Sequence, residues 1–264
     1  MIVDKIFTYI TQKEKTLDES LSSQVGYIAK YAFQRQFMLN SERKGGVLYL
    51  SSCGNCQRQQ AYKFWDYPVN GKEQDSRSKM VFWLGDLAEF TVIGLAKSAG
   101  LQVTACGLNQ ATVYLRVGDT LIAGHPDGLL LQDGEIILLE VKSMTTYKYK
   151  DFERGEIDEA YLDQTNAYLA ALGLRRAIMV ALNKESGILN ERMIDRDDKR
   201  VERIKARLGR VLTSKKEELP KAEYTFGEDG KYPWNCLYCG YWRRCKPNAE
   251  QVLVGQKYIL KEKN

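Results

Sequence analysis

The chain has 264 residues, of which 44% are hydrophobic and 28% charged, and its formal net charge is +5 at pH 7. This is the composition of an ordinary globular protein with one large or two small domains, and so mild a charge leaves any nucleic-acid affinity to local patches. The first residues contain no signal-peptide core and no apolar run approaches the about 20 residues of a membrane span, so we expect a cytoplasmic protein without membrane contact.

The first 40 residues favour two helices, interrupted near residues 16–23. The second helix carries aromatic side chains among basic ones, and at helical spacing we expect these rings in the core rather than as platforms for bases. The rings are those of Tyr27, Tyr31, Phe33 and Phe37.

A helix is expected over residues 80–99, after a polar loop at 66–79. Glu89 lies on the same face as Gly85, one turn earlier. A glycine inside a helix costs about 0.5–1 kcal/mol relative to alanine, so Gly85 predicts the close approach of another backbone. The alternative for Glu89 is a solvated charge on the helix surface. Strand-like runs follow at 101–106 and 111–117.

Residues 121–144 predict a β-hairpin, because two apolar runs flank Asp133-Gly134. This dipeptide favours a two-residue type I′ turn, in which both residues have positive φ. With that turn Gln132 pairs with Glu135, and the rest of the register follows from this pair.

Continued to its end, this register places Asp127 opposite Glu140 and His125 opposite Lys142, with all four side chains on one face. Two carboxylates at a closely spaced pair should repel each other, and a divalent cation between them would remove the conflict. The alternative is an edge strand with ordinary surface charges.

Pro126 supports the cation, because proline has no N–H to donate to the carbonyl of Val141. A carbonyl beside two carboxylates would be a third oxygen ligand for a hard cation such as Mg²⁺.

The segment after the hairpin interleaves rings and ammonium groups, as single-strand grooves and ordinary exposed loops both do. Its residues are Tyr147, Lys148, Tyr149 and Lys150. A helix is then expected at 157–173, with Tyr161, Gln164 and Tyr168 on one face. A strand at 176–183 and a basic helix at 196–218 follow, and we expect the basic side chains of this helix to be solvated rather than bound to phosphate.

Six cysteines in a chain of this kind indicate metal or redox chemistry rather than disulfides. One four-cysteine set would be a zinc site, made of Cys53, Cys56, Cys236 and Cys239. Another would hold an iron–sulfur cluster and uses Cys56, Cys236, Cys239 and Cys245. Cys106 is expected to be a small buried residue.

The series PD…E-V-K, formed by Asp127, Glu140 and Lys142, resembles the signature of the PD-(D/E)XK nuclease superfamily. The GxxxE of Glu89 resembles the first motif of that superfamily. Gln164 and Tyr168 resemble the QxxxY motif of its RecB-like branch. One cysteine before the core and C-x2-C-x5-C after it resemble the iron–sulfur exonucleases of this branch, which include the AddB nuclease domain and small CRISPR-associated and phage-encoded nucleases.

The resemblance implies an α/β fold with a mixed sheet flanked by helices, and a four-cysteine clasp joining the N- and C-terminal segments. The resemblance covers residues 51–245. We expect one nuclease domain over 1–264, with a helical segment at 1–50, a core at 80–213 and cluster-binding or loop segments at 51–79 and 214–264.

The implied activity is that of a DNA exonuclease acting on single strands or linear ends. Mg²⁺ or Mn²⁺ would be held by Asp127, Glu140, the Val141 carbonyl and Glu89, with His125 as a further candidate. Lys142 would orient or deprotonate the attacking water, and the QxxxY pair would contact DNA and position Lys142. A [4Fe–4S] cluster would be held by Cys56, Cys236, Cys239 and Cys245, and DNA would also contact Tyr147, Lys148 and Lys150.

Two alternatives remain open. One is an endonuclease on the same core with structural zinc, and the other is a non-catalytic DNA-binding subunit of a repair or CRISPR-adaptation complex. Candidate partners are DNA and proteins of CRISPR adaptation, recombination or repair.

Overall fold

The structure is a computed structural model that describes residues 1–13, 15, 19–38, 45–70, 76–255 and 257–263. The chain divides into two compact units. The first comprises Met1–Glu42, Tyr49–Gly54 and Arg77–Ile204, and the second comprises Arg43–Leu48, Asn55–Ser76 and Lys205–Asn264. The organisation as one nuclease domain stays a prediction.

The α-helices are α1 (Ile2–Thr11), α2 (Glu19–Phe33), α3 (Gln57–Phe64), α4 (Ser76–Ser98), α5 (Thr146–Glu153), α6 (Glu159–Leu172), α7 (Asp198–Leu212), α8 (Trp234–Leu237) and α9 (Trp242–Cys245). The strands are β1 (Gln102–Thr104), β2 (Val113–Val117), β3 (Thr120–Gly124), β4 (Gly128–Gln132), β5 (Glu135–Met144), β6 (Arg176–Asn183), β7 (Leu189–Asp195), β8 (Ala249–Val254) and β9 (Lys257–Glu262). Shorter helical turns are η1 (Gln34–Met38), η2 (Leu50–Ser52) and η3 (Gly107–Asn109).

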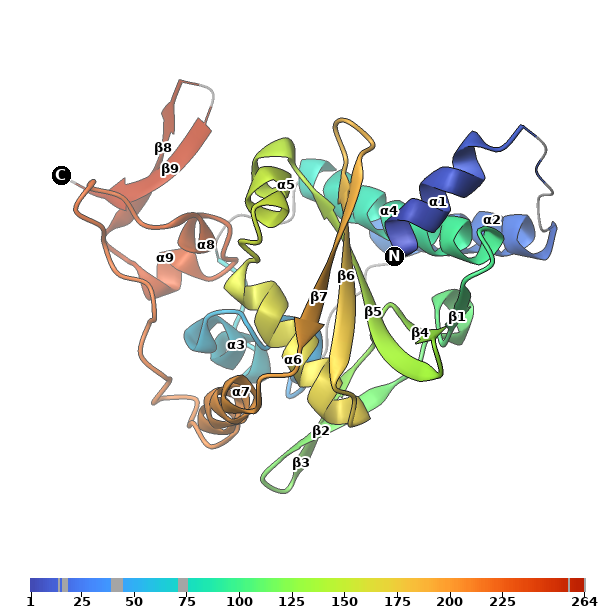
Figure 1. Ribbon diagram of the computed structural model, residues 1–264. Helices are drawn as coiled ribbons and strands as arrows, with labels where there is room; N and C mark the ends of the chain where they lie inside the picture. Colours follow the sequence, from blue (N-terminus) through green and yellow to red (C-terminus); the bar gives the residue numbers. More distant parts are fainter. Residues whose placement is uncertain (14, 16–18, 39–44, 71–75, 256, 264) are drawn as a thin grey trace. The chain divides into compact units, whose positions relative to one another are not determined.

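The first unit is built on a five-stranded sheet in the order β1-β4-β5-β6-β7 (Figure 1). The β5–β6 pair is parallel, since α5 and α6 carry the chain back to the same end of the sheet, and the other neighbours are antiparallel. The expected mixed sheet with flanking helices is therefore confirmed.

The hairpin turn and its first five pairs are as the sequence predicts. Asp133 and Gly134 have φ of 52° and 79°, and the register runs from Gln132↔Glu135 to Gly128↔Leu139. Beyond that pair the prediction is wrong. Residues 120–124 form β3, which pairs with β2 in a separate two-stranded sheet. Pro126 cannot donate to a ladder, and the chain leaves β5 there.

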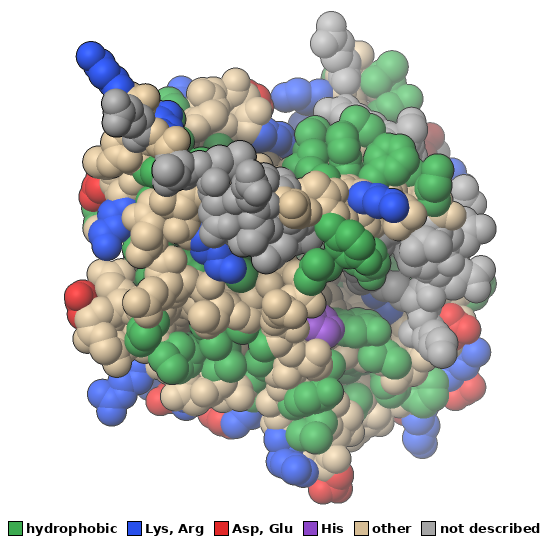
Figure 2. All heavy atoms as spheres, turned by 90° about the vertical axis from the view of Figure 1, so that its right-hand side faces the viewer, with side chains coloured by type: hydrophobic (Ala, Val, Ile, Leu, Met, Phe, Trp, Pro, Cys, Tyr) green, Lys and Arg blue, Asp and Glu red, His purple; other side chains and the backbone are tan. Residues whose placement is uncertain are grey.

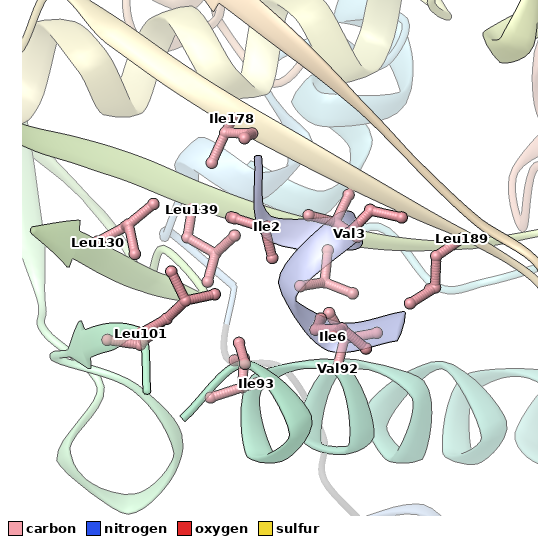
Figure 3. Close-up of a cluster of buried hydrophobic side chains, with 14 of the residues drawn as sticks. Ile2, Val3, Ile6, Val92, Ile93, Leu101, Leu130, Leu139, Ile178 and Leu189 are labelled. Atoms are coloured by element: carbon pink, nitrogen blue, oxygen red, sulfur yellow. The ribbon is translucent and has the colours of Figure 1, made fainter. Parts of the chain in front are cut away.

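One face of the sheet packs against α1 and α4 in a continuous apolar core (Figure 3). The core holds residues from three layers: Ile2, Val3 and Ile6 of α1, Val92, Ile93 and Ala96 of α4, and Leu130, Ile137, Leu139, Val141, Ile178 and Val180 of the sheet. In Figure 3 the α1 side chains lie between those of the sheet and those of α4. The first helix is thus an integral part of the core.

A buried carboxylate of β7 anchors α1. Glu191 Oε2 accepts the N–H groups of Ile2 at 2.9 Å and Val3 at 3.3 Å, which are first-turn donors that no helical carbonyl can satisfy.

The opposite face carries α6. Asp158 caps this helix by accepting the Ala160 N–H at 3.0 Å. Asp163 on α6 is 3% exposed and forms ion pairs with Arg200 at 2.7 Å and Arg203 at 2.8 Å. Arg203 is 51% exposed, so it is solvated as the sequence predicted and also pairs with α6.

The second unit has a small core of its own around α8, α9 and the β8–β9 hairpin. Tyr62 of α3 stacks on Tyr241 with 5.1 Å between ring centroids, and the Asn70 N–H donates to the Gly240 carbonyl at 3.0 Å. This ring contact and this hydrogen bond join segments that are more than 150 positions apart in the sequence. Basic side chains of α7 also bond here, since Arg207 pairs with Glu223 at 3.2 Å.

Four further expectations differ from the structure. The segment after β5 forms helix α5, and β7 and the β8–β9 hairpin were not predicted. Three rings expected in the core are exposed: Tyr27 by 57%, Tyr31 by 50% and Phe33 by 43%. No described atom outside its own helix lies within 4 Å of a Cβ built on Gly85, so close backbone approach does not explain this glycine.

In the part of the chain that the structure describes, no helix is both long enough and apolar enough to cross a membrane.

Candidate active site

The end of the β4–β5 ladder gathers the predicted signature. Asp127 directly precedes β4, and its Oδ2 accepts the backbone N–H of Val141 at 2.8 Å. The carboxylate thus takes the place of the missing strand partner beside Pro126. Because the N–H and C=O of a strand residue point to the same side, the Val141 carbonyl also faces Asp127.

Glu140 and Lys142 form a buried ion pair on β5. Lys142 Nζ donates to Glu140 Oε2 at 2.8 Å, and the Glu140 side chain has no exposed surface. Glu140 Oε1 has no hydrogen-bond partner among the described residues. An unpaired carboxylate oxygen in a buried site is costly, and a cation is the natural partner for it.

The carboxyl groups of the site have raised pKa values. Burial and then the Asp127 charge raise the pKa of Glu140 to about 7. Burial, Asp127 and Asp86 raise the pKa of Glu89 to about 9. Burial also raises the pKa of Asp127, against the opposing effects of Lys142 and the Val141 N–H. Acidic groups placed so close together favour a divalent cation.

The pKa of Lys142 is raised as well, which for an amine favours the charged form. Burial alone would lower its pKa, but Glu140 and Asp127 outweigh burial and raise it above the ordinary value. The amine is therefore a cation in the protein as described, and the depressed pKa that a lysine base requires is absent. The ammonium also lies 5.6 Å from the centre of the Tyr161 ring on α6.

Asp86 is a site residue that sequence reasoning missed. Its charge raises the pKa of both Glu89 and Asp127. The spacing of three residues between Asp86 and Glu89 on one helix was the signal that could have revealed it.

Gln164 and Tyr168 lie together on the face of α6 turned to the sheet. Gln164 Nε2 and Tyr168 Oη are 3.4 Å apart, and Tyr168 is completely buried. Burial and then Glu140 raise the pKa of Tyr168. A Cβ on Gly124 would stand 2.5 Å from Tyr168 Cε1, so glycine is required there for the ring to reach its place.

His125 is separated from the predicted pair with Lys142. It is exposed, its Nδ1 lies 3.4 Å from Thr112 Oγ1, and it lines a cleft together with Glu89.

The predicted DNA-contacting side chains lie on α5. Tyr147 is 74% exposed, and Lys150, three residues later on the same helix, is also exposed. Lys148 forms an ion pair with Asp158 at 3.3 Å.

The predicted cluster ligands all belong to the second unit. Cys56, Cys236, Cys239 and Cys245 line one cavity of that unit. Burial raises the pKa of Cys236 to about 12, and the other three thiols of the set add to the rise, while Lys246 opposes it. Cys53 belongs to the first unit, where it is fully buried.

In the described part of the chain, no three His, Cys, Asp or Glu side chains already have the arrangement of a coordination sphere. The donor types nevertheless suit the two groups: oxygen atoms with like charges for a hard cation, and four thiols that line one cavity for thiolate ligation. Binding of either group requires the side chains to adjust.

Comparison with known families decides the assignment. A model of the PD-(D/E)XK nuclease superfamily matches residues 63–246, more than half of the chain. The chain belongs to the PD-(D/E)XK nuclease superfamily. Nucleases of this superfamily generally use divalent metals such as Mg²⁺, and membership supports a nuclease that acts on DNA. A search of curated proteins finds no matching relative.

Solved structures are similar to the chain at low identity, and one of the three named here has a TM-score above 0.5. A crystal structure of SSO0001 is 14% identical with a TM-score of 0.51, covering 84% of this chain and 95% of its own. An alkaline exonuclease from Laribacter hongkongensis is 15% identical with a TM-score of 0.39, covering 69% and 90%. A phage-related exonuclease from Haemophilus somnus is 10% identical with a TM-score of 0.35, covering 80% and 90%.

In this PD-(D/E)XK nuclease the arrangement at the end of β4 and β5 can hold a cation on oxygen atoms while Lys142 supplies a fixed positive charge next to it.

Proposed function

We propose that this protein is a metal-dependent DNA exonuclease of the iron–sulfur RecB-like branch. The observation that carries the nuclease site is the junction of Asp127, Glu140 and Lys142, in which a carboxylate oxygen is buried without a partner. A functionless ladder end would place water-exposed side chains there instead.

Asp127, Glu140 and the Val141 carbonyl would hold one Mg²⁺ or Mn²⁺, with Glu89 as a further ligand. When bound, the ion would polarise the scissile phosphate and lower the pKa of a bound water. Once the ion shares the Glu140 charge, the Lys142 ammonium is free to turn toward a phosphate oxygen or the attacking water. There it would orient the attacking water or, because the ion offsets the carboxylate charges that raise its pKa, deprotonate that water.

Gln164 and Tyr168 would position the site from α6. The buried Tyr168 ring supports Gly124, and the Gln164 amide, next to its hydroxyl, can reach a DNA phosphate. On α5, Tyr147 and Lys150 present a ring and an ammonium group to solvent, and we place the passing strand there as well.

The second unit would hold a [4Fe–4S] cluster on Cys56, Cys236, Cys239 and Cys245. Two observations support this set over the zinc set with Cys53: these four thiols share one cavity, and Cys53 is buried in the first unit. Burial raises the pKa of Cys236 and Cys245 although Lys246 opposes the rise, so the bound metal itself would have to favour the thiolate form that ligation needs. A cluster there would tie α3 to α8 and α9, and a structural role follows.

The exonuclease mode rests on the resemblance of the cysteine pattern to iron–sulfur exonucleases. A role beside CRISPR-adaptation, recombination or repair proteins stays a prediction of the same resemblance.

End-labelled single-stranded and double-stranded DNA, incubated with and without Mn²⁺, tests the activity. We expect cleavage that needs the ion and that degrades linear DNA faster than covalently closed circles. Equal rates on both forms would favour an endonuclease. Binding of DNA without hydrolysis in either metal would favour the non-catalytic subunit.

A further inference from the structure

A cleft of about 470 Å³ in the first unit borders the candidate metal site. Glu89 and Asp86 of α4 line it, as do Tyr31 of α2, His125 and Gly124. Figure 2 shows the histidine, drawn in purple, in a hollow of the surface between hydrophobic side chains. The volume lies within the about 300–1,000 Å³ that small-molecule sites usually have.

The charges of the cleft are unsuited to phosphate. Its described lining contains two carboxylates and neither lysine nor arginine. Phosphate would be attracted to the end of the cleft at the metal site, where Glu89 would share the cation and Lys142 lies close by, and the rest of the described lining offers it no cationic side chain. The cleft therefore suits an uncharged part of a nucleotide.

Aromatic rings make up much of the lining. Besides the completely buried Tyr168, they belong to Tyr31, Tyr49 and Phe90. Tyr31 is half exposed, so one face of its ring is available to a ligand at little cost in folding. Aromatic faces of this kind stack on bases of any sequence.

Polar groups complete the lining and can read the edge of a base. Gln110 donates its Nε2 to the Pro126 carbonyl at 3.0 Å, which holds the side chain in place with its amide oxygen still able to accept. Thr112 Oγ1 and His125 Nδ1 are 3.4 Å apart and fix each other's direction. A base can meet such groups with its pairing edge only when it is unpaired.

We propose that this cleft binds the base and sugar of one unpaired terminal nucleotide, stacked on Tyr31, while its phosphate lies at the metal site. The inference rests on the proposed nuclease function and adds the part of the substrate that is recognised. The enzyme would then need an unpaired end and would read the presence of a base there.

An oligonucleotide with an abasic terminal residue tests this directly, because it keeps the phosphates and removes only the base. Substrates carry the abasic residue at the 5′ end, the 3′ end or neither. We expect wild-type kcat/KM to fall about tenfold for one of the two modified ends, equivalent to about 1.4 kcal/mol of lost binding in the transition state. The sensitive end is then the one held in the cleft.

Variants separate stacking from a structural effect. Tyr31→Ala should lower kcat/KM about tenfold on the intact strand and add little on the abasic strand, because the two changes remove the same contact. Tyr31→Phe keeps the ring and should behave as wild type. Tyr258→Ala removes a tyrosine that is 51% exposed in the second unit and serves as the matched control, with no change expected on either substrate.

Equal loss on both substrates for Tyr31→Ala, or wild-type indifference to the abasic residue, would overturn the cleft proposal while leaving the nuclease intact. A Tyr31→Ala protein with unchanged kinetics but altered oligomeric mass would show that the ring contacts protein instead, which also overturns it. Absence of cleavage by the wild type would refute the proposed function. In that case the same strands, labelled with a fluorophore, are tested for binding in Ca²⁺, which checks the cleft proposal separately. About tenfold weaker binding of the abasic strand would support the proposal, and equal binding would overturn it.

Discussion

Gly124→Ala should damage both stability and activity, because the added methyl group has no room. Its carbon would stand 2.5 Å from Tyr168 Cε1 and 2.8 Å from Leu50 Cβ, whereas ordinary contacts lie between 3.4 and 4 Å. Tyr168 and Leu50 are both completely buried, so neither can move into solvent. Overpacking of this kind costs about 1–3 kcal/mol. For a chain of this size we expect the Tm to fall by about 2–12 °C.

The effect on catalysis follows from the direction of the shift. Restoring normal contact requires Tyr168 to retreat by about 1 Å, and its bond with Gln164 is already long at 3.4 Å. Misplacement of a positioning group by about 1 Å can cost about a hundredfold in rate. We therefore expect a loss of tenfold or more in kcat at a temperature where the variant is still folded.

Thermal unfolding and the cleavage of end-labelled DNA in Mn²⁺ measure the two effects. Gly85→Ala is the matched control, because nothing described outside its own helix lies within 4 Å of the new carbon. Alanine is the better helix former, so this control should gain about 0.5–1 kcal/mol. A Gly124→Ala protein with wild-type Tm and rate would refute the tight packing of Tyr168 against β3.

The other predictions concern the ion pair, the metal, α1 and the cluster. Lys142→Ala should abolish DNA cleavage, to less than about 1% of the wild-type rate, with an unchanged circular dichroism spectrum, and near-wild-type cleavage would remove the assigned role. The pKa of Glu140 is raised from 4.5 to about 7, so its contribution to the stability of metal-free protein is present below about pH 4.5 and lost as the pH rises through about 7. The Tm in EDTA should therefore fall over that window. Mg²⁺ should raise the Tm more at high pH than at low pH. A Tm gain independent of pH would contradict this. Glu191→Ala removes the acceptor of two first-turn amides of α1 and should cost about 1–2 kcal/mol in urea unfolding without affecting the nuclease rate; an equal loss of rate would place α1 in the site. Protein purified without oxygen should be brown and contain iron. Cys245→Ser should remove the colour and lower the Tm, whereas Cys53→Ser should keep the colour and the Tm of the wild type. Colourless protein with one zinc that depends on Cys53 would establish the other cysteine set.

Part of this structure was predictable from the sequence because it depends on local interactions. The Asp133-Gly134 turn and the register up to Gly128↔Leu139 follow from two positive φ angles and two apolar runs, which need no distant contact. The strand at 176–183 and the helix around Gln164 were similarly predicted, because hydrophobic periodicity and capping are local properties.

Near the site the same reasoning failed at a definite residue. The register was extended through Pro126, although proline ends the ladder there and β3 pairs with β2 instead. Asp127 still reaches Glu140's strand, but through its side chain on the Val141 N–H rather than as a cross-strand neighbour. The predicted residues therefore lie together, but in a geometry that differs in part from the predicted one.

The sequence by itself determined which residues are the candidates for the chemistry: the acid–acid–lysine series, the QxxxY pair and the cysteines belong to recognisable patterns. Tertiary structure alone decided what surrounds them. It brought Asp86 next to Glu89, buried α1 beneath the sheet by way of Glu191, and left Tyr31 exposed at the edge of a cleft. Helical spacing shows that side chains share a face, but whether that face meets a core, a carboxylate or solvent depends on what lies across from it, often more than a hundred residues away.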